Sequence, residues 1–170
     1  LAEPAMFLGL VALVKVTESL ELSGILARDA GMAWGRAAPT MVMVVAGLFV
    51  ILLAENARIP VDDPSTHLEL TMIHEVMVLD HSGPALAAIL YGAALKFFSM
   101  GAILARLVVP VSAGSPWLDW GAFLGIMIVV AVLVGVVESS MARLRLLHVP
   151  NLLIAAGVIT GFGLLLVLVR

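Results

Sequence analysis

The side chains best suited to chemistry gather in residues 58–83, which we call the acidic loop. These 26 residues hold five carboxylates, three histidines and one arginine. They are Asp62, Asp63, Glu69, Glu75, Asp80, His67, His74, His81 and Arg58. Carboxylates and imidazoles either bind metal ions or exchange protons with their surroundings. The acidic loop therefore raises two chemical possibilities, a metal site and a proton path.

The spacing of the histidines argues against a metal site. His67 and His74 are seven residues apart, which on a helix places them on one face but about 10 Å apart along the axis. Two side chains that far apart cannot bind one ion together. The pair His74-Glu75 also lacks the second histidine that the zinc-protease spacing requires. We expect this chain to bind no metal.

A helix is predicted inside the acidic loop, with Asp63 as its N-cap, Pro64 in its first position and an end near Leu79. Much of this helix is apolar, at Leu68, Leu70, Met72, Ile73, Val76, Met77, Val78 and Leu79. A solvated surface loop is the alternative, but a helix this apolar is expected to pack against other protein. Burial raises the pKa of a carboxylate toward neutral pH. The pattern therefore favours proton exchange.

Charged residues also occur inside long apolar runs. Lys96 lies twelve residues after Pro84, near the middle of its run, and is too deep to reach the membrane surface easily. An ionisable group at that depth usually faces the interior of a helix bundle and has a partner. Glu55 and Glu138 are the two candidate partners. A structural ion pair and a proton relay would use the same residues, so both interpretations remain open.

Other charges lie nearer the ends of the runs. Lys15 and Arg106 are expected to extend toward the membrane surface. Glu138 precedes Arg143 and Arg145 by a little over one helical turn, which suits an acid–base pair within one helix.

The elements that must position these residues are membrane helices. Of the 170 residues 62% are hydrophobic and 12% are charged, and the mean hydropathy is +1.17. A soluble domain is about 45–50% apolar and about 25% charged, so lipid must cover most of this chain. A span of about 20 helical residues crosses the hydrocarbon core. We predict an all-α transmembrane helix bundle that forms a single membrane domain over 1–170. Its five expected spans are about 3–17, 38–57, 84–109, 119–142 and 149–169.

Composition excludes several functions. The formal net charge of −3 excludes a nucleic-acid partner on electrostatic grounds. The absence of cysteine excludes cysteine-ligated iron–sulfur clusters and c-type haem. There is no nucleophile elbow and no phosphate-binding loop. Leu1 lies inside an apolar run with no basic segment before it, so we expect a fragment of a larger subunit rather than a signal peptide.

Three short motifs resemble a known family. The segments from Glu55 to Asp62, from Leu68 to Leu70 and from Asp80 to Gly83 resemble the loop between spans five and six of the H-type (subunit 1) membrane protein of respiratory complex I. The segment from Glu138 to Leu146 is closer to the membrane subunit of formate hydrogenlyase and hydrogenase-4 complexes, and Lys96 fits that branch too. The resemblance covers essentially the whole chain, which would correspond to the C-terminal half of an eight-span member of the family.

The resemblance implies a non-catalytic membrane subunit that joins a redox arm to ion translocation in the cytoplasmic membrane, with the acidic loop in the cytoplasm. It implies peripheral iron–sulfur and hydrogenase-like partner subunits, which carry the iron–sulfur clusters and a nickel–iron centre. It also implies antiporter-like membrane partners. No cofactor is expected on this chain. Val61 and His81 replace the usual phenylalanine and tyrosine, which puts quinone binding in doubt. The candidate proton-path residues are Glu55, Asp62, Glu69, Glu75, Asp80, Lys96 and Glu138. The candidate residues for loop structure and docking are Arg58, Pro60, Asp63, Arg143 and Arg145.

Two other functions fit the same residues. A stand-alone secondary transporter could use Lys96 and Glu138 as coupling groups, although the internal repeats common in transporters are absent. A structural anchor could dock a soluble partner through the acidic loop.

Overall fold

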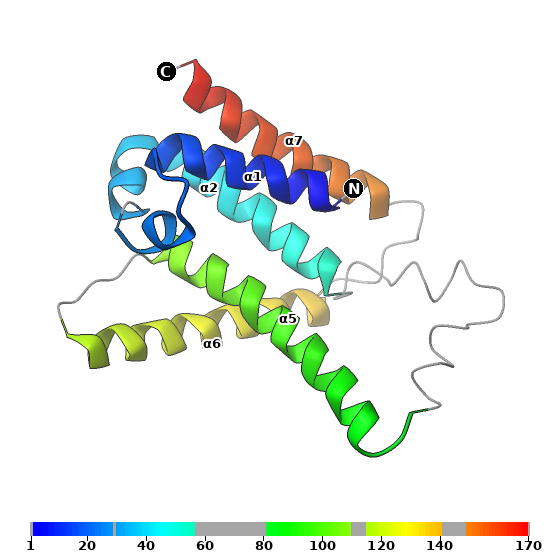
Figure 1. The fold of residues 1–170 in the computed structure, drawn as a ribbon. Helices are drawn as coiled ribbons and strands as arrows, with labels where there is room; N and C mark the ends of the chain where they lie inside the picture. The colour runs from blue at the N-terminus through cyan, green and yellow to red at the C-terminus, as the bar shows by residue number, and fades with distance from the viewer. Residues whose placement is uncertain (1, 29, 57–80, 110–114, 141–148, 170) are drawn as a thin grey trace.

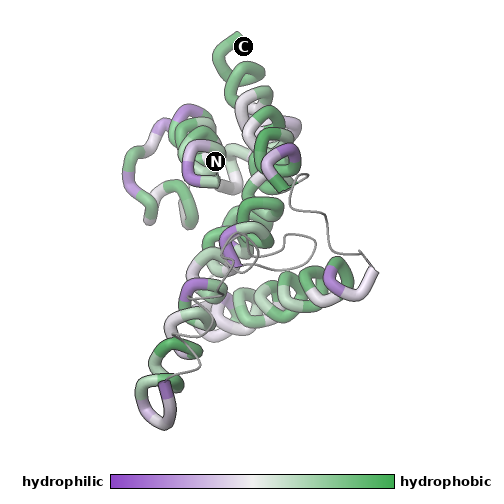
Figure 2. The backbone as a smooth tube through the Cα atoms, turned by 90° about the vertical axis from the view of Figure 1, so that its right-hand side faces the viewer, coloured by the Kyte–Doolittle hydropathy of each residue, from purple (hydrophilic) through white to green (hydrophobic). Residues whose placement is uncertain are grey.

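The computed structural model describes residues 2–28, 30–56, 81–109, 115–140 and 149–169, and all the regular secondary structure in these residues is helical. The elements are α1 (Ala2–Thr17), a short π-helix η1 (Gly24–Arg28), α2 (Ala30–Glu55), α5 (Pro84–Val108), α6 (Pro116–Ser140) and α7 (Val149–Leu168). The predicted all-helical membrane bundle is confirmed. Hydrophobic residues run along every helix (Figure 2).

Four helices are long and apolar enough to cross a membrane: Gly31–Glu55, Pro84–Val108, Pro116–Ser140 and Val149–Leu168. α1 has 16 residues, or about 24 Å of helix, which is shorter than a hydrocarbon core of about 30 Å. α1 ends at Thr17, and the next residue, Glu18, has a φ of 56°, in the left-handed region that stops a right-handed helix.

α2 begins earlier than the expected span over 38–57, because residues 30–36 are helical as well. The two parts meet at a break, where Ala37 has φ −137° and ψ 47°. Pro39 follows two residues later and has no backbone N–H to donate, so the helical hydrogen-bond ladder is interrupted here. The proline ring also clashes with the carbonyl group four residues earlier in a helix, here that of Gly35 before the break. The proline therefore accounts for the kink.

The core is formed by α1, α2 and α7, which pack against one another along their lengths (Figure 1). Small residues allow the close approach. A β-carbon at Gly9 would lie 3.5 Å from Leu48, and one at Gly163 would lie 3.4 Å from Met43. Small residues at helix contacts are typical of membrane bundles, where close packing replaces the hydrophobic effect as the driving force.

α5 and α6 form a second layer. α5 contacts α2 and α6, while its first half extends away from the bundle and is almost wholly exposed (Figure 1). Gly101 of α5 packs against Met127 of α6, and Phe98 meets Phe123 edge to face with ring centroids 6.4 Å apart.

The helix directions give the bundle two ends. The end of α2, the start of α5, the end of α6 and the start of α7 adjoin residues 57–80 or 141–148, and we call this the loop-side end. The far end holds the ends of α1, α5 and α7 and the starts of α2 and α6.

Candidate functional site

An ion pair joins α5 to the loop-side end of α2. Lys96 Nζ lies 2.8 Å from Glu55 Oε2 and also 2.8 Å from the backbone carbonyl oxygen of Glu55. Of the two partners that the sequence left open for Lys96, the structure therefore shows Glu55. Both hydrogen bonds are charge-assisted, because the donor is the ammonium group of Lys96. Charge-assisted hydrogen bonds are stronger than those between neutral groups.

The end of α2 explains why a lysine binds there. The last four carbonyls of a helix have no partner within the helix, and the helix dipole makes that end attractive to a cation. Asn56 donates from Nδ2 to the carbonyl of Leu52 at 2.8 Å, and Lys96 donates from Nζ to the carbonyl of Glu55. Lys96 thus caps α2 as well as neutralising the carboxylate. Asn56 was not among the expected site residues, because a capping role depends on where α2 stops.

An apolar cluster lies beside the pair. Leu52, Leu53 and Val134 are buried there. Four partly buried side chains pack against them, namely Phe49, Phe97, Met100 and Val137. The cluster joins α2, α5 and α6, so the ion pair is held beside a region filled by apolar side chains.

Glu138 lies in the last turn of α6, directly after Val137 of this cluster, and is partly buried. A second candidate proton-path carboxylate is therefore placed on the helix that flanks the same apolar cluster. Its expected pairing with Arg143 or Arg145 lies outside the described residues.

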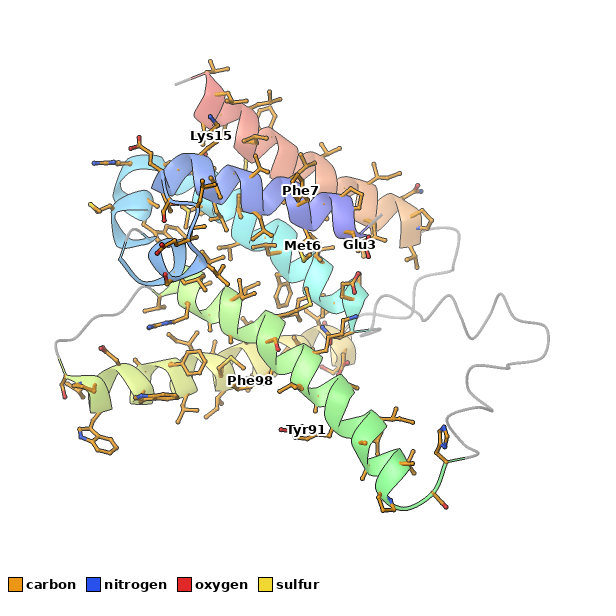
Figure 3. The ribbon with its side chains drawn as sticks, in the orientation of Figure 1. Glu3, Met6, Phe7, Lys15, Tyr91 and Phe98 are labelled. Atoms are coloured by element: carbon orange, nitrogen blue, oxygen red, sulfur yellow. The ribbon has the colours of Figure 1, made fainter. Side chains whose placement is uncertain are left out.

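The ion pair faces the outside of this chain. The Lys96 side chain is 50% exposed and that of Glu55 is 30% exposed. Tyr91, Leu95 and Phe98 of the same helix, α5, are exposed as well, and Figure 3 shows Tyr91 and Phe98 along that helix. Ionisable groups inside a membrane face other protein or water instead of hydrocarbon. The arrangement therefore requires a polar covering, either protein or water, over Lys96.

Several expected site residues lie outside the described residues. These are Arg58, Pro60, Asp62, Asp63, Glu69, Glu75, Asp80, Arg143 and Arg145. His81 is described and exposed, just before Gly83 and the start of α5 at Pro84. Within the described segments no group of His, Asp or Glu side chains could hold a metal ion.

The comparisons with known proteins identify the family. The family model described as NADH dehydrogenase matches residues 1–169. The comparisons with curated proteins and with solved structures gave no match. The family match covers the motifs around Glu55 and Glu138 as well as all the helices. The chain belongs to the NADH dehydrogenase family and is a complex I subunit 1-like (H-type) membrane subunit of a respiratory oxidoreductase complex.

Proposed function

We propose that this chain couples electron transfer on partner subunits to ion movement across the membrane, and that Lys96 and Glu55 form one step of the ion path. The observation that carries the proposal is the contact between Lys96 and Glu55 at the loop-side end. A carboxylate and an ammonium 2.8 Å apart can pass a proton between them with little movement.

The surroundings of the pair support the same role. Leu52, Leu53 and Val134 keep water from one side, while the exposed side of Lys96 leaves room for a donor or acceptor. Glu138, in the last turn of α6 next to Val137 of the cluster, is a further group that can hold a proton. In this proposal the loop acids Asp62, Glu69, Glu75 and Asp80 deliver protons to Glu55 from the cytoplasm.

A structural role is the second candidate, because Lys96 also caps the backbone of α2. The variant Lys96→Arg separates the two roles. A guanidinium keeps the positive charge and the hydrogen bonds, but it does not release its proton in proteins. If Lys96 passes protons, Lys96→Arg should assemble normally and still lose ion translocation.

The experiment uses the intact complex in sealed vesicles and measures the redox rate and proton uptake together. Lys96→Arg, Lys96→Gln and Glu55→Gln should each reduce the rate of proton uptake by about a hundredfold, the lower end of typical acid–base effects. Ser99→Ala is the matched control, because Ser99 lies on the same helix and donates only to its own helix at Leu95, at 2.6 Å. Full proton uptake in an assembled Lys96→Arg complex would leave only the structural role.

The redox partner is proposed to be of the hydrogenase type, with a nickel–iron centre and iron–sulfur clusters on other subunits and no quinone site formed by this chain. The motif from Glu138 to Leu146 and the replacements at Val61 and His81 support this branch. Purification of the native complex tests it. Nickel in stoichiometric amount is expected, whereas a bound flavin without nickel would favour a complex I-like partner. A chain that purifies alone and transports ions alone would favour the stand-alone transporter.

A further inference from the structure

The end of α2 contacts α5 at two neighbouring levels. Glu55 Oε2 accepts a hydrogen bond from Lys96 Nζ at 2.8 Å. Asn56, the next residue of the chain, directs Nδ2 at Met100 Sδ, and these two atoms are 3.9 Å apart. Lys96 and Met100 are four residues apart on α5, so they lie on one face of the helix, one turn after the other. Two adjacent residues of one helix therefore meet two successive turns of the other.

Both hydrogens of the Asn56 amide group have acceptors. Nδ2 donates to the carbonyl of Leu52 at 2.8 Å as well as to Met100 Sδ. An amide nitrogen carries two hydrogens, so both bonds can form together. The backbone N–H of Asn56 donates to the same carbonyl at 3.2 Å. These bonds hold Asn56 to the last turn of α2, so its side chain reaches the sulfur at one level of α5.

Met100 is held in place by packing. It is partly buried and packs against both the core of the bundle and the apolar cluster beside the ion pair. A thioether sulfur is a weak acceptor, so its bond with Asn56 adds little stability. What the contact provides is direction, because the packed sulfur is a fixed point along α5 that the Asn56 amide can reach.

The position of α5 along α2 decides whether Lys96 meets its partners. Lys96 bonds two oxygen atoms of Glu55, Oε2 and the backbone carbonyl oxygen, both at 2.8 Å. A slide of α5 by one residue would move its side chains about 1.5 Å along the axis and about 100° around it, and hydrogen bonds do not survive such a movement. Because the first half of α5 is almost wholly exposed, the contacts of its second half, Met100 among them, must oppose the slide.

We propose that Asn56 is a positioning residue for the ion pair. Through Met100 it sets the register of α5 against the end of α2, and this register lets Lys96 reach Glu55. Its effect on the rate of proton uptake rests on the proposed function of the pair, whereas its effect on geometry does not. If Asn56 only capped α2, its loss would lower stability and leave the contact between Lys96 and Glu55 unchanged.

The variant Asn56→Leu keeps the approximate size of the side chain and removes both donors. The rate of proton uptake by the intact complex in sealed vesicles should fall about tenfold, within the loss of up to about a hundredfold that a misplacement of about 1 Å can cause. The same substitution in a Lys96→Arg complex should cause little further loss, because the step that Asn56 supports is already absent.

Thr17→Val is the matched control. Thr17 is the last residue of α1, and its hydroxyl donates to the carbonyl four residues earlier, that of Leu13, at 2.8 Å. The control therefore removes the same kind of helix-end bond, but at the far end of the bundle. Its rate of proton uptake should be unchanged.

The coupling between Lys96 and Glu55 gives a second readout, which does not depend on proton movement. Thermal unfolding of the purified protein in detergent measures it through a double-mutant cycle of Lys96→Met and Glu55→Gln. In an Asn56→Leu background this coupling should be lost. Met100→Leu keeps most of the apolar volume and removes only the acceptor, so it should weaken both the coupling and proton uptake, though less than Asn56→Leu does.

The two readouts separate the positioning role from the proposed function. Loss of the coupling with full proton uptake would support the positioning role and count against the pair as a step of the ion path. Unchanged coupling in Asn56→Leu, or an equal loss of proton uptake in Thr17→Val, would overturn the positioning role. If Asn56→Leu does not assemble, unchanged coupling in Met100→Leu would overturn it.

Discussion

Gly47 of α2 and Thr160 of α7 approach so closely that a β-carbon at position 47 would overlap Cγ2 of Thr160. The same β-carbon would lie 3.4 Å from the carbonyl oxygen of Ala156. Thr160 is fully buried, and its hydroxyl lies 3.0 Å from the carbonyl oxygen of Ala156 on its own helix. Thr160 is β-branched, so its side chain has few other rotamers. The contact therefore fixes how closely α2 and α7 pack.

The variant Gly47→Ala should destabilise the protein. Overpacking of this kind costs about 1–3 kcal/mol of unfolding free energy, and the stiff Thr160 side chain offers little relief. Thermal unfolding of the purified protein in detergent measures the loss. Gly161→Ala is the control, because position 161, next to Thr160 on α7, has open space around it, so this variant should unfold at the original temperature or slightly above. Equal unfolding temperatures for the two variants would contradict the contact.

The two hydrogen bonds of Lys96 predict unequal effects of removing each partner. Lys96→Met removes the bonds to the carboxylate and to the backbone of Glu55, whereas Glu55→Gln leaves the backbone carbonyl in place. Lys96→Met should therefore lower the free energy of unfolding more than Glu55→Gln does. Because both side chains are partly exposed, we expect a coupling energy of about 0.5–1 kcal/mol. A double-mutant cycle measures this energy, and additive single effects would argue against a direct pair.

Counting residues placed Lys96 correctly within α5 but could not give its depth relative to α2. Lys96 is the middle residue of α5, yet it meets the last residue of α2, because the first half of α5 extends away from the bundle at the loop-side end (Figure 1). Glu55 and Glu138 were equally suitable partners in sequence, since each ends an apolar run. Only the packing of the helices distinguishes them.

At the ends of helices, the residue types predicted the structure better than counts of residues did. Pro84 after Gly83 marked the start of α5, since proline is favoured in the first turn of a helix. The pocket that Lys15, Arg36 and Leu166 line at the far end of the bundle had no comparable signal. It depends on the kink at Ala37 and on the ends of two other helices, which no local pattern brings together.

Trp34 links the start of α2 to the end of α5, because its Nε1 donates a 2.7 Å hydrogen bond to the carbonyl of Leu107. That carbonyl belongs to the last turn of the helix, where an intrahelical partner is missing. Trp34→Phe keeps most of the ring and removes the donor, so it should cost about 1 kcal/mol of unfolding free energy. Trp117→Phe, at a side chain that is 87% exposed, should cost much less in the same denaturation experiment. A larger effect at Trp117 would argue against this bond.

The directions of the helices place Ser82 and Ser115 on opposite sides of the membrane. Ser82 precedes α5 at the loop-side end, and Ser115 precedes α6 at the far end. The chain contains no cysteine, so Ser82→Cys and Ser115→Cys each introduce one thiol of similar size into it. With the acidic loop in the cytoplasm, a membrane-impermeant maleimide should label Ser82→Cys only in inside-out vesicles and Ser115→Cys only in right-side-out vesicles. Ala105→Cys, at a fully buried position, should resist labelling in both. Labelling of both serine variants from one side would mean that α5 does not cross the membrane, and the reverse pattern would place the acidic loop outside the cytoplasm.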